Sequence, residues 1–116
     1  MRSSRSALVA VIVLAVGCGD DTSEPAVSAC STLTYQNFGE PFVLDWCRGC
    51  HSSGLPDDMR QGAPLDVNFD DLDHVRAWSV RIATRSAGPL PTMPPAAGPS
   101  QEERDMLAEW IQCGMR

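Results

Sequence analysis

Two cysteines and a histidine carry the most specific chemistry in this sequence. Cys47, Cys50 and His51 form a C-x-x-C-H motif, which is the spacing of covalent haem attachment. Two thiols at this separation can each form a thioether with one of the two vinyl groups of a porphyrin. The next residue, His51, then lies under the iron as its proximal ligand. The motif therefore predicts one covalently bound haem c.

Closely spaced cysteines also serve two other chemistries. A thioredoxin-like redox pair belongs to a βαβ setting, and no strand with period-two alternation is visible in the sequence. Half a zinc site would need two further clustered Cys or His ligands, whereas the other histidine, His74, is expected on the surface of a helix. A haem-free binding or thiol–disulfide module with free thiols at Cys47 and Cys50 is the remaining alternative.

An iron held by His51 has a second axial position, for which the methionines are candidates. After residue 18 these are Met59, Met93, Met106 and Met115. Met106 fits the apolar face of a predicted helix and is expected in the core. Met115 adjoins the C-terminus, where we expect fraying. Met59 follows His51 closely in a polar loop, so that the opposite haem face is hard for it to reach.

The remaining candidate, Met93, lies in a segment dominated by proline and glycine, residues 88–99. Because proline fixes φ, this loop is expected to be stiff. A rigidly held thioether suits an electron carrier, since little rearranges when the iron changes valence. We therefore expect Met93 to be the distal ligand, and Met/His ligation raises the reduction potential. In the alternative, Met93 only covers the haem, and the iron is five-coordinate or bound by histidine.

Residues 1–17 predict export. Arg2 and Arg5 precede an apolar run at 7–16. This run is far shorter than the ~20 residues of a membrane-spanning helix and suits the core of a signal peptide. Export would place the chain in an oxidising compartment, where disulfides persist.

The junction after residue 17 resembles a bacterial lipoprotein signal. Gly17 precedes Cys18, which in that family is lipidated and becomes the first residue of the mature chain, although Ala15 stands where leucine is usual. Residues 18–29 are small and polar, as in a flexible tether. We expect a lipoprotein anchored through Cys18 on the periplasmic or cell-envelope side of a membrane. An ordinary signal peptide with a stray Cys18 is the alternative.

The periodicity of apolar residues predicts an all-α domain with three main helices, at about Pro41–Cys50, Asp71–Ala87 and Gln101–Cys113. Asp70 or Asn68 is expected to cap the second helix. Ser100 and Glu103 form a capping box for the third.

Composition limits the classes of function. The chain has 116 residues, 15 acidic against 9 basic, and a net charge of −6, which argues against nucleic-acid binding. After residue 18 it holds few large aliphatic residues for its length, so either the chain is disordered or a non-peptide group completes its core. An acidic surface would also suit docking to redox partner proteins with basic patches.

From about residue 38 to 116, the order of helix, C-x-x-C-H, loop, helix, Met-Pro-Pro and final helix resembles a class I c-type cytochrome. The resemblance implies a small all-α fold wrapped around one haem, with the first and last helices crossing and Trp110 near that crossing. It also implies a proline carbonyl that accepts a hydrogen bond from the proximal histidine, for which Pro64 is the candidate. The segment 52–69, which shows no clear helix, departs from the family pattern.

These assignments leave Cys30 and Cys113, which we expect to form a disulfide across the helix crossing, rather than two unpaired thiols. The haem domain would then span residues 30–116. The expected function is electron transfer on a haem with His51 and Met93 as axial ligands, without enzymatic activity. A small haem sensor or peroxidase with a labile distal ligand is the alternative.

Overall fold

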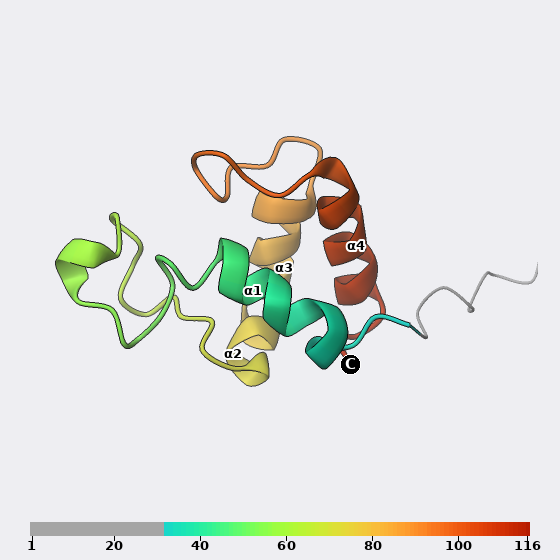
Figure 1. Cartoon of the computed structure of the whole chain (residues 1–116), viewed down its shortest axis with the longest axis horizontal. Coiled ribbons are helices and arrows are strands. Elements are labelled where there is room, and N and C mark those ends of the chain that lie inside the picture. The colour runs from blue at the N-terminus through green and yellow to red at the C-terminus, as the bar shows by residue number, and fades with distance from the viewer. Residues whose placement is uncertain (1–31) are drawn as a thin grey trace, which may run out of the picture.

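The computed structural model describes residues 32–116, and this part of the chain is helical without strands, which confirms the all-α prediction (Figure 1). The expected signal peptide, the tether, Cys18 and Cys30 lie outside the described residues. Between residues 32 and 116, no helix is both long and apolar enough to cross a membrane. The elements are η2 (Tyr35–Gly39), α1 (Glu40–Trp46), η3 (Asp57–Met59), α2 (Leu72–Ala77), α3 (Ser79–Ile82), η4 (Ala83–Ala87) and α4 (Gln101–Gln112).

The first helical segment begins earlier than the sequence predicts. A capping box between Thr34 and Asn37 starts the π-helical turn η2, which continues directly into α1. The α-helix ends at Trp46, not at Cys50, and the backbone N–H of Cys47 donates to the carbonyl of Val43 as its last bond. The cysteine motif therefore lies in a turn that follows the helix.

The second predicted helix is interrupted. Asp71, not the expected Asp70 or Asn68, caps α2 by accepting a hydrogen bond from the N–H of His74. At Trp78 the backbone leaves helical geometry, with φ −103° and ψ 6°, before α3 and η4 continue to Ala87. The break divides one apolar stripe between two short helices.

The last helix, α4, begins as predicted. Ser100 and Glu103 form the expected capping box. Near its C-terminal end, α4 meets the first helical segment at Trp110, which is completely buried. A Cβ at Gly39 would overlap the indole of Trp110, so only glycine permits this close approach. Trp110 therefore lies where α4 packs against the first helical segment, which is the position that the resemblance implies for it.

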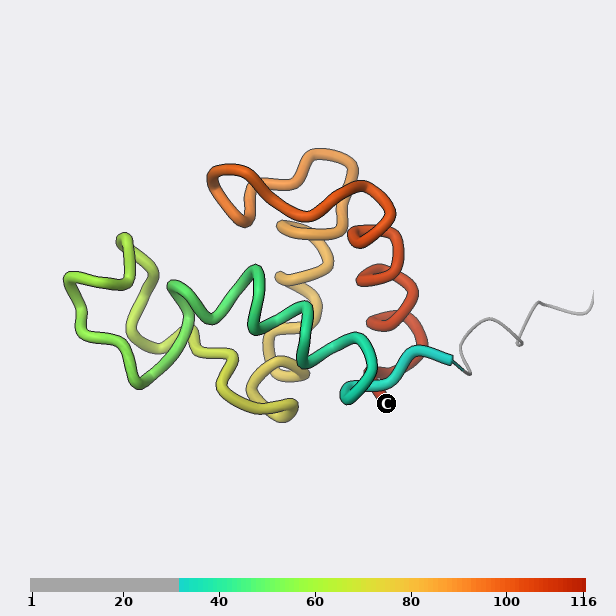
Figure 2. The backbone as a smooth tube through the Cα atoms, viewed as in Figure 1, coloured from blue at the N-terminus to red at the C-terminus, as the bar shows by residue number. Residues whose placement is uncertain are grey.

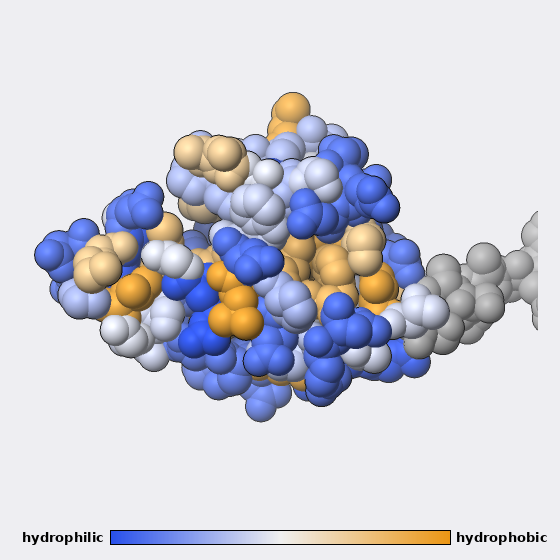
Figure 3. All heavy atoms as spheres, in the orientation of Figure 1, coloured by the Kyte–Doolittle hydropathy of each residue, from blue (hydrophilic) through white to orange (hydrophobic). Residues whose placement is uncertain are grey.

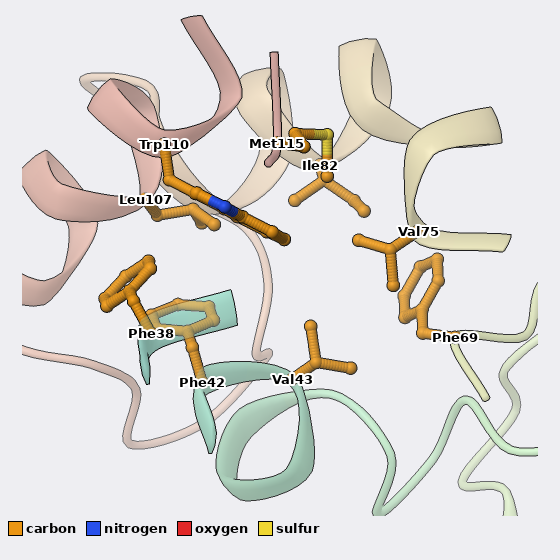
Figure 4. Packing of buried hydrophobic residues seen from close by; sticks show 9 residues of the cluster. All are labelled: Phe38, Phe42, Val43, Phe69, Val75, Ile82, Leu107, Trp110 and Met115. Carbon is orange, nitrogen blue, oxygen red and sulfur yellow. The ribbon is translucent and has the colours of Figure 1, made fainter. Parts of the chain in front are cut away.

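Nine buried apolar residues form one core between these helices (Figure 4). They are Phe38, Phe42, Val43, Phe69, Val75, Ile82, Leu107, Trp110 and Met115. In the face drawn in Figure 3, apolar residues come to the surface near the middle of the molecule and hydrophilic residues border them. The nine core residues themselves are almost completely covered.

The end of the chain belongs to this core. We expected Met115 to be frayed, but its side chain is only 3% exposed. Its N–H donates to the carbonyl of Trp110, and its own carbonyl accepts from the guanidinium of Arg76. The left-handed conformation of Gly114, with φ +82°, turns the chain back after α4 and makes these contacts possible.

Candidate functional site

A cavity of about 570 Å³ lies between α1, the segment 47–69, the α2–η4 region and the loop after η4. This volume falls within the ~300–1,000 Å³ typical of small-molecule and cofactor sites. Cys47, Cys50, His51 and Met93 all line the cavity. Four residues singled out from the sequence are therefore brought together, from two segments of the chain far apart in sequence.

The turn after α1 positions the two thiols. The N–H groups of Cys50 and His51 both donate to the carbonyl of Cys47, at 3.1 and 3.0 Å. Both cysteines carry free thiols and are half-buried at the cavity wall. Burial raises the pKa of the Cys47 thiol to about 12.

The His51 ring is fixed on two sides. Its Nδ1 lies 3.0 Å from the carbonyl oxygen of Val67, and its ring packs against Phe69 with centroids 4.9 Å apart. The backbone reinforces this arrangement, because the N–H of Phe69 donates to the carbonyl of His51 at 2.9 Å. A proton on Nδ1 that is donated to Val67 leaves the lone pair of Nε2 available as a ligand.

The acceptor for His51 differs from the residue expected from the family resemblance. The carbonyl of Pro64 accepts a hydrogen bond from Arg60 Nη2 at 2.7 Å and is not the partner of His51. The N–H of Val67 donates to the carbonyl of Pro64 and closes a turn at 64–67. This turn presents the carbonyl of Val67, and not that of Pro64, to the imidazole. The expectation for Pro64 was wrong in the residue, although the type of contact is present.

Met93 is held by its backbone on both sides. Its N–H donates to the carbonyl of Arg85 at 2.9 Å, and its carbonyl accepts from Arg104 Nη1 at 3.2 Å. Arg104 is buried and also binds the carbonyl of Ser86. A Cβ at Gly98 would come within 2.5 Å of Arg104 Nη2, so the loop closes tightly over the guanidinium. Sequence reasoning missed Arg104, because nothing in its helical position distinguishes it from a solvated arginine.

The other three methionines between residues 32 and 116 do not line this cavity. Met59 is 58% exposed, Met115 lies in the core, and Met106 borders a separate, smaller hollow. Within the described chain, Met93 is therefore the methionine placed with Cys47, Cys50 and His51.

Aromatic and basic residues complete the cavity wall. Trp46 and Trp78 line it together with Arg81 and Arg85. The indole N–H of Trp46 donates to Glu103 Oε1 at 3.3 Å, which ties this wall to the start of α4. His74 is not among the lining residues; it is exposed and pairs with Asp71 at 2.8 Å, in agreement with its expected surface position.

A zinc site and a disulfide at Cys113 are the two other arrangements to consider. In residues 32–116, no three His, Cys, Asp or Glu side chains cluster as metal ligands would, so a zinc site has no support there. Cys113 is disulfide-bonded. Its expected partner, Cys30, lies outside the described residues, and the pairing of the two stays a prediction.

Comparisons of the chain with protein-family models, with curated proteins and with solved structures gave no match. The functional argument therefore depends on the motif and on the geometry of the cavity.

Proposed function

We propose that this protein carries single electrons on one covalently attached haem c, with His51 and Met93 as the axial ligands of its iron. The observation that carries the proposal is that one cavity is lined by Cys47, Cys50, His51 and Met93 together. Covalent attachment uses two free thiols, ligation of the iron uses an adjacent imidazole nitrogen, and the cysteine motif provides all three groups in a single turn after α1.

Each residue has a defined role in this proposal. Cys47 and Cys50 form the thioethers, His51 binds through Nε2 while Val67 holds its Nδ1, and Met93 supplies a thioether sulfur. A haem bound here would supply one-electron chemistry, as its iron changes between the ferric and ferrous states.

The chain contributes rigidity and a mostly apolar cavity wall. The His51 ring is fixed by Val67 and Phe69, and the backbone of Met93 is fixed by Arg85 and Arg104. Ligands held in this way move little when the charge of the iron changes, which favours rapid electron transfer without conversion of a substrate. The apolar wall lowers the local dielectric and strengthens every electrostatic effect within the cavity.

The setting of this activity follows from the part of the chain outside the structure. We propose export, lipidation of Cys18 and attachment to the extracytoplasmic side of a membrane through the tether 18–29. Redox proteins with basic docking patches would then be the partners, because the chain carries a net charge of −6.

Absorption spectroscopy of the exported mature protein tests the proposal, with wild type, Met93→Ala and Met59→Ala compared in both oxidation states. We expect the wild type and Met59→Ala to hold covalent, low-spin haem, and Met93→Ala to turn high-spin. Met59 is the matched control because it is a methionine exposed outside the cavity.

Two outcomes would contradict the proposal. A high-spin wild type that readily binds carbon monoxide in the ferrous state would favour the sensor or peroxidase alternative. A mature protein without haem, produced in cells with a working haem-attachment system, would show that the central inference is wrong.

A further inference from the structure

Arg60 is a buried cation in the long loop between the cysteine motif and α2, which projects from the helices (Figure 2). Its side chain is only 2% exposed, yet it also lines the cavity. Arginine stays ionised under all ordinary conditions, so a full positive charge is buried at this wall.

All five N–H groups of Arg60 have acceptors, and every acceptor is uncharged. The guanidinium donates to the carbonyls of Ser52, Ala63, Pro64 and Val67 and to the side-chain oxygen of Asn68. None of the ion pairs within residues 32–116 includes Arg60. The nearby carboxylate of Asp70 instead accepts from Ser52 and Ser53. The hydrogen bonds thus satisfy the donors of Arg60 and leave its charge without a counter-ion.

One of these acceptors also serves the proximal histidine. The carbonyl oxygen of Val67 accepts from Arg60 Nη2 at 3.1 Å and from His51 Nδ1 at 3.0 Å. A carbonyl that holds an imidazole N–H raises the basicity of that ligand. Because Arg60 draws electron density from the same oxygen, this effect on His51 is weakened.

We propose that Arg60 is a positioning residue that raises the reduction potential of the site, through its unbalanced charge and through the Val67 carbonyl that it shares with His51. This inference rests on the proposed function. Reduction adds one electron to the site and lowers its positive charge by one, with the electron supplied by the redox partner. A nearby fixed cation favours the less positive, reduced state. A His51 ring that donates less electron density to the iron stabilises the oxidised state less, which acts in the same direction.

The charge can be tested without removing the guanidinium. Asn68 Oδ1 lies 2.9 Å from Arg60 Nη1, so Asn68→Asp keeps that acceptor and adds a negative charge beside the cation. We expect this variant to lower the equilibrium constant for reduction by about tenfold, which for one electron is about 59 mV. The measurement is a spectroscopic redox titration of the haem-loaded mature protein.

Two controls separate charge from structure. Asn68→Ala removes the same amide without adding charge, and we expect it not to lower the potential. Gln112→Glu adds the same charge at an exposed position at the end of α4, on the other side of the molecule from this loop, and we expect a much smaller shift (Figure 1).

Equal shifts in Asn68→Asp and either control would overturn the inference.

Arg60→Lys provides a second test, because it keeps the charge but not the fork of five donors. Its potential should lie between that of the wild type and that of Arg60→Gln, and identical potentials in all three would also overturn the inference. These failures leave haem attachment in the wild type intact, whereas a wild type without haem would overturn the proposed function and this inference together.

Discussion

The carbonyl of Met93 and the guanidinium of Arg104 are joined by a hydrogen bond of 3.2 Å. Arg104 lies in α4, and Met93 lies in the proline-rich loop that precedes it. A buried arginine on the last helix therefore fixes the position of the proposed distal ligand. This contact makes the rigidity of the loop depend on a tertiary interaction as well as on its prolines.

Arg104→Gln should loosen the distal ligand. The shorter, neutral side chain leaves the carbonyls of Met93 and Ser86 without a buried donor, which typically costs about 1–3 kcal/mol of the free energy of unfolding. We expect the ferrous variant to bind carbon monoxide faster than the wild type. Stopped-flow mixing checks this, with the exposed α4 variant Glu102→Gln as control. Unchanged carbon monoxide binding in a destabilised Arg104→Gln would limit Arg104 to a role in stability.

Gly39→Ala should disturb the helix crossing. The added Cβ overlaps the buried indole of Trp110, and overpacking of this kind costs about 1–3 kcal/mol. Gly54→Ala is the matched control, because its Cβ would meet only Ser52 Oγ at an ordinary 3.8 Å. Urea unfolding of both variants gives the comparison, and equal stabilities would mean that the crossing can relax without loss.

Asp70→Asn should lower stability at neutral pH but much less in acid. Hydrogen bonds from Ser52, and then from Ser53, lower the pKa of the Asp70 carboxyl to about 2. Its value in the unfolded chain is higher, near 3.9, so its ionised form stabilises the fold above about pH 4. That contribution is lost as the pH falls from about 4 towards 2.

The size of this effect is limited by solvent. The Asp70 side chain is 23% exposed, and after allowance for screening we expect about 1 kcal/mol at pH 7. Unfolding free energies measured between pH 2 and 7 check the prediction, with the exposed Asp58→Asn of the same loop as control. A difference between wild type and Asp70→Asn that stays constant over this range would contradict it.

Cys30→Ser should expose the thiol of Cys113. Cys113 is disulfide-bonded, and we expect Cys30 to be its partner. Loss of a disulfide that closes a loop of this length removes about 3–5 kcal/mol of stability. Alkylation of the denatured, unreduced protein followed by mass spectrometry should label Cys113 in the variant and not in the wild type. A labelled Cys113 in the wild type would refute the pairing.

Local signals were the part of this structure that sequence reasoning could predict. The capping box of Ser100 and Glu103 depends on residues three apart, and the cysteine motif is equally local. The stiff loop around Met93 was also readable without coordinates, and the cavity places Met93 with this motif. Met115 was rightly set aside but for the wrong reason, because it is buried in the core and not frayed.

The unpredicted features depend on contacts between distant residues. Nothing in the pattern around Arg60 shows that four backbone carbonyls converge on it, because carbonyls are common to all residues. The same holds for the acceptor of the His51 hydrogen bond, which is the carbonyl of Val67 and not that of Pro64 because Arg60 and the 64–67 turn occupy the latter. Met115 was misjudged since its burial requires the turn at Gly114 and the arrival of Arg76 from α2.

The placement of the tryptophans gives the site a natural optical signal. The chain has three tryptophans, of which Trp46 and Trp78 line the cavity and Trp110 lies in the adjoining core. A strongly absorbing group in that cavity would take up the excitation of all three indoles by energy transfer. Intrinsic fluorescence would then be dim in the loaded, folded protein and bright when the chain opens, so emission would report occupancy and unfolding together.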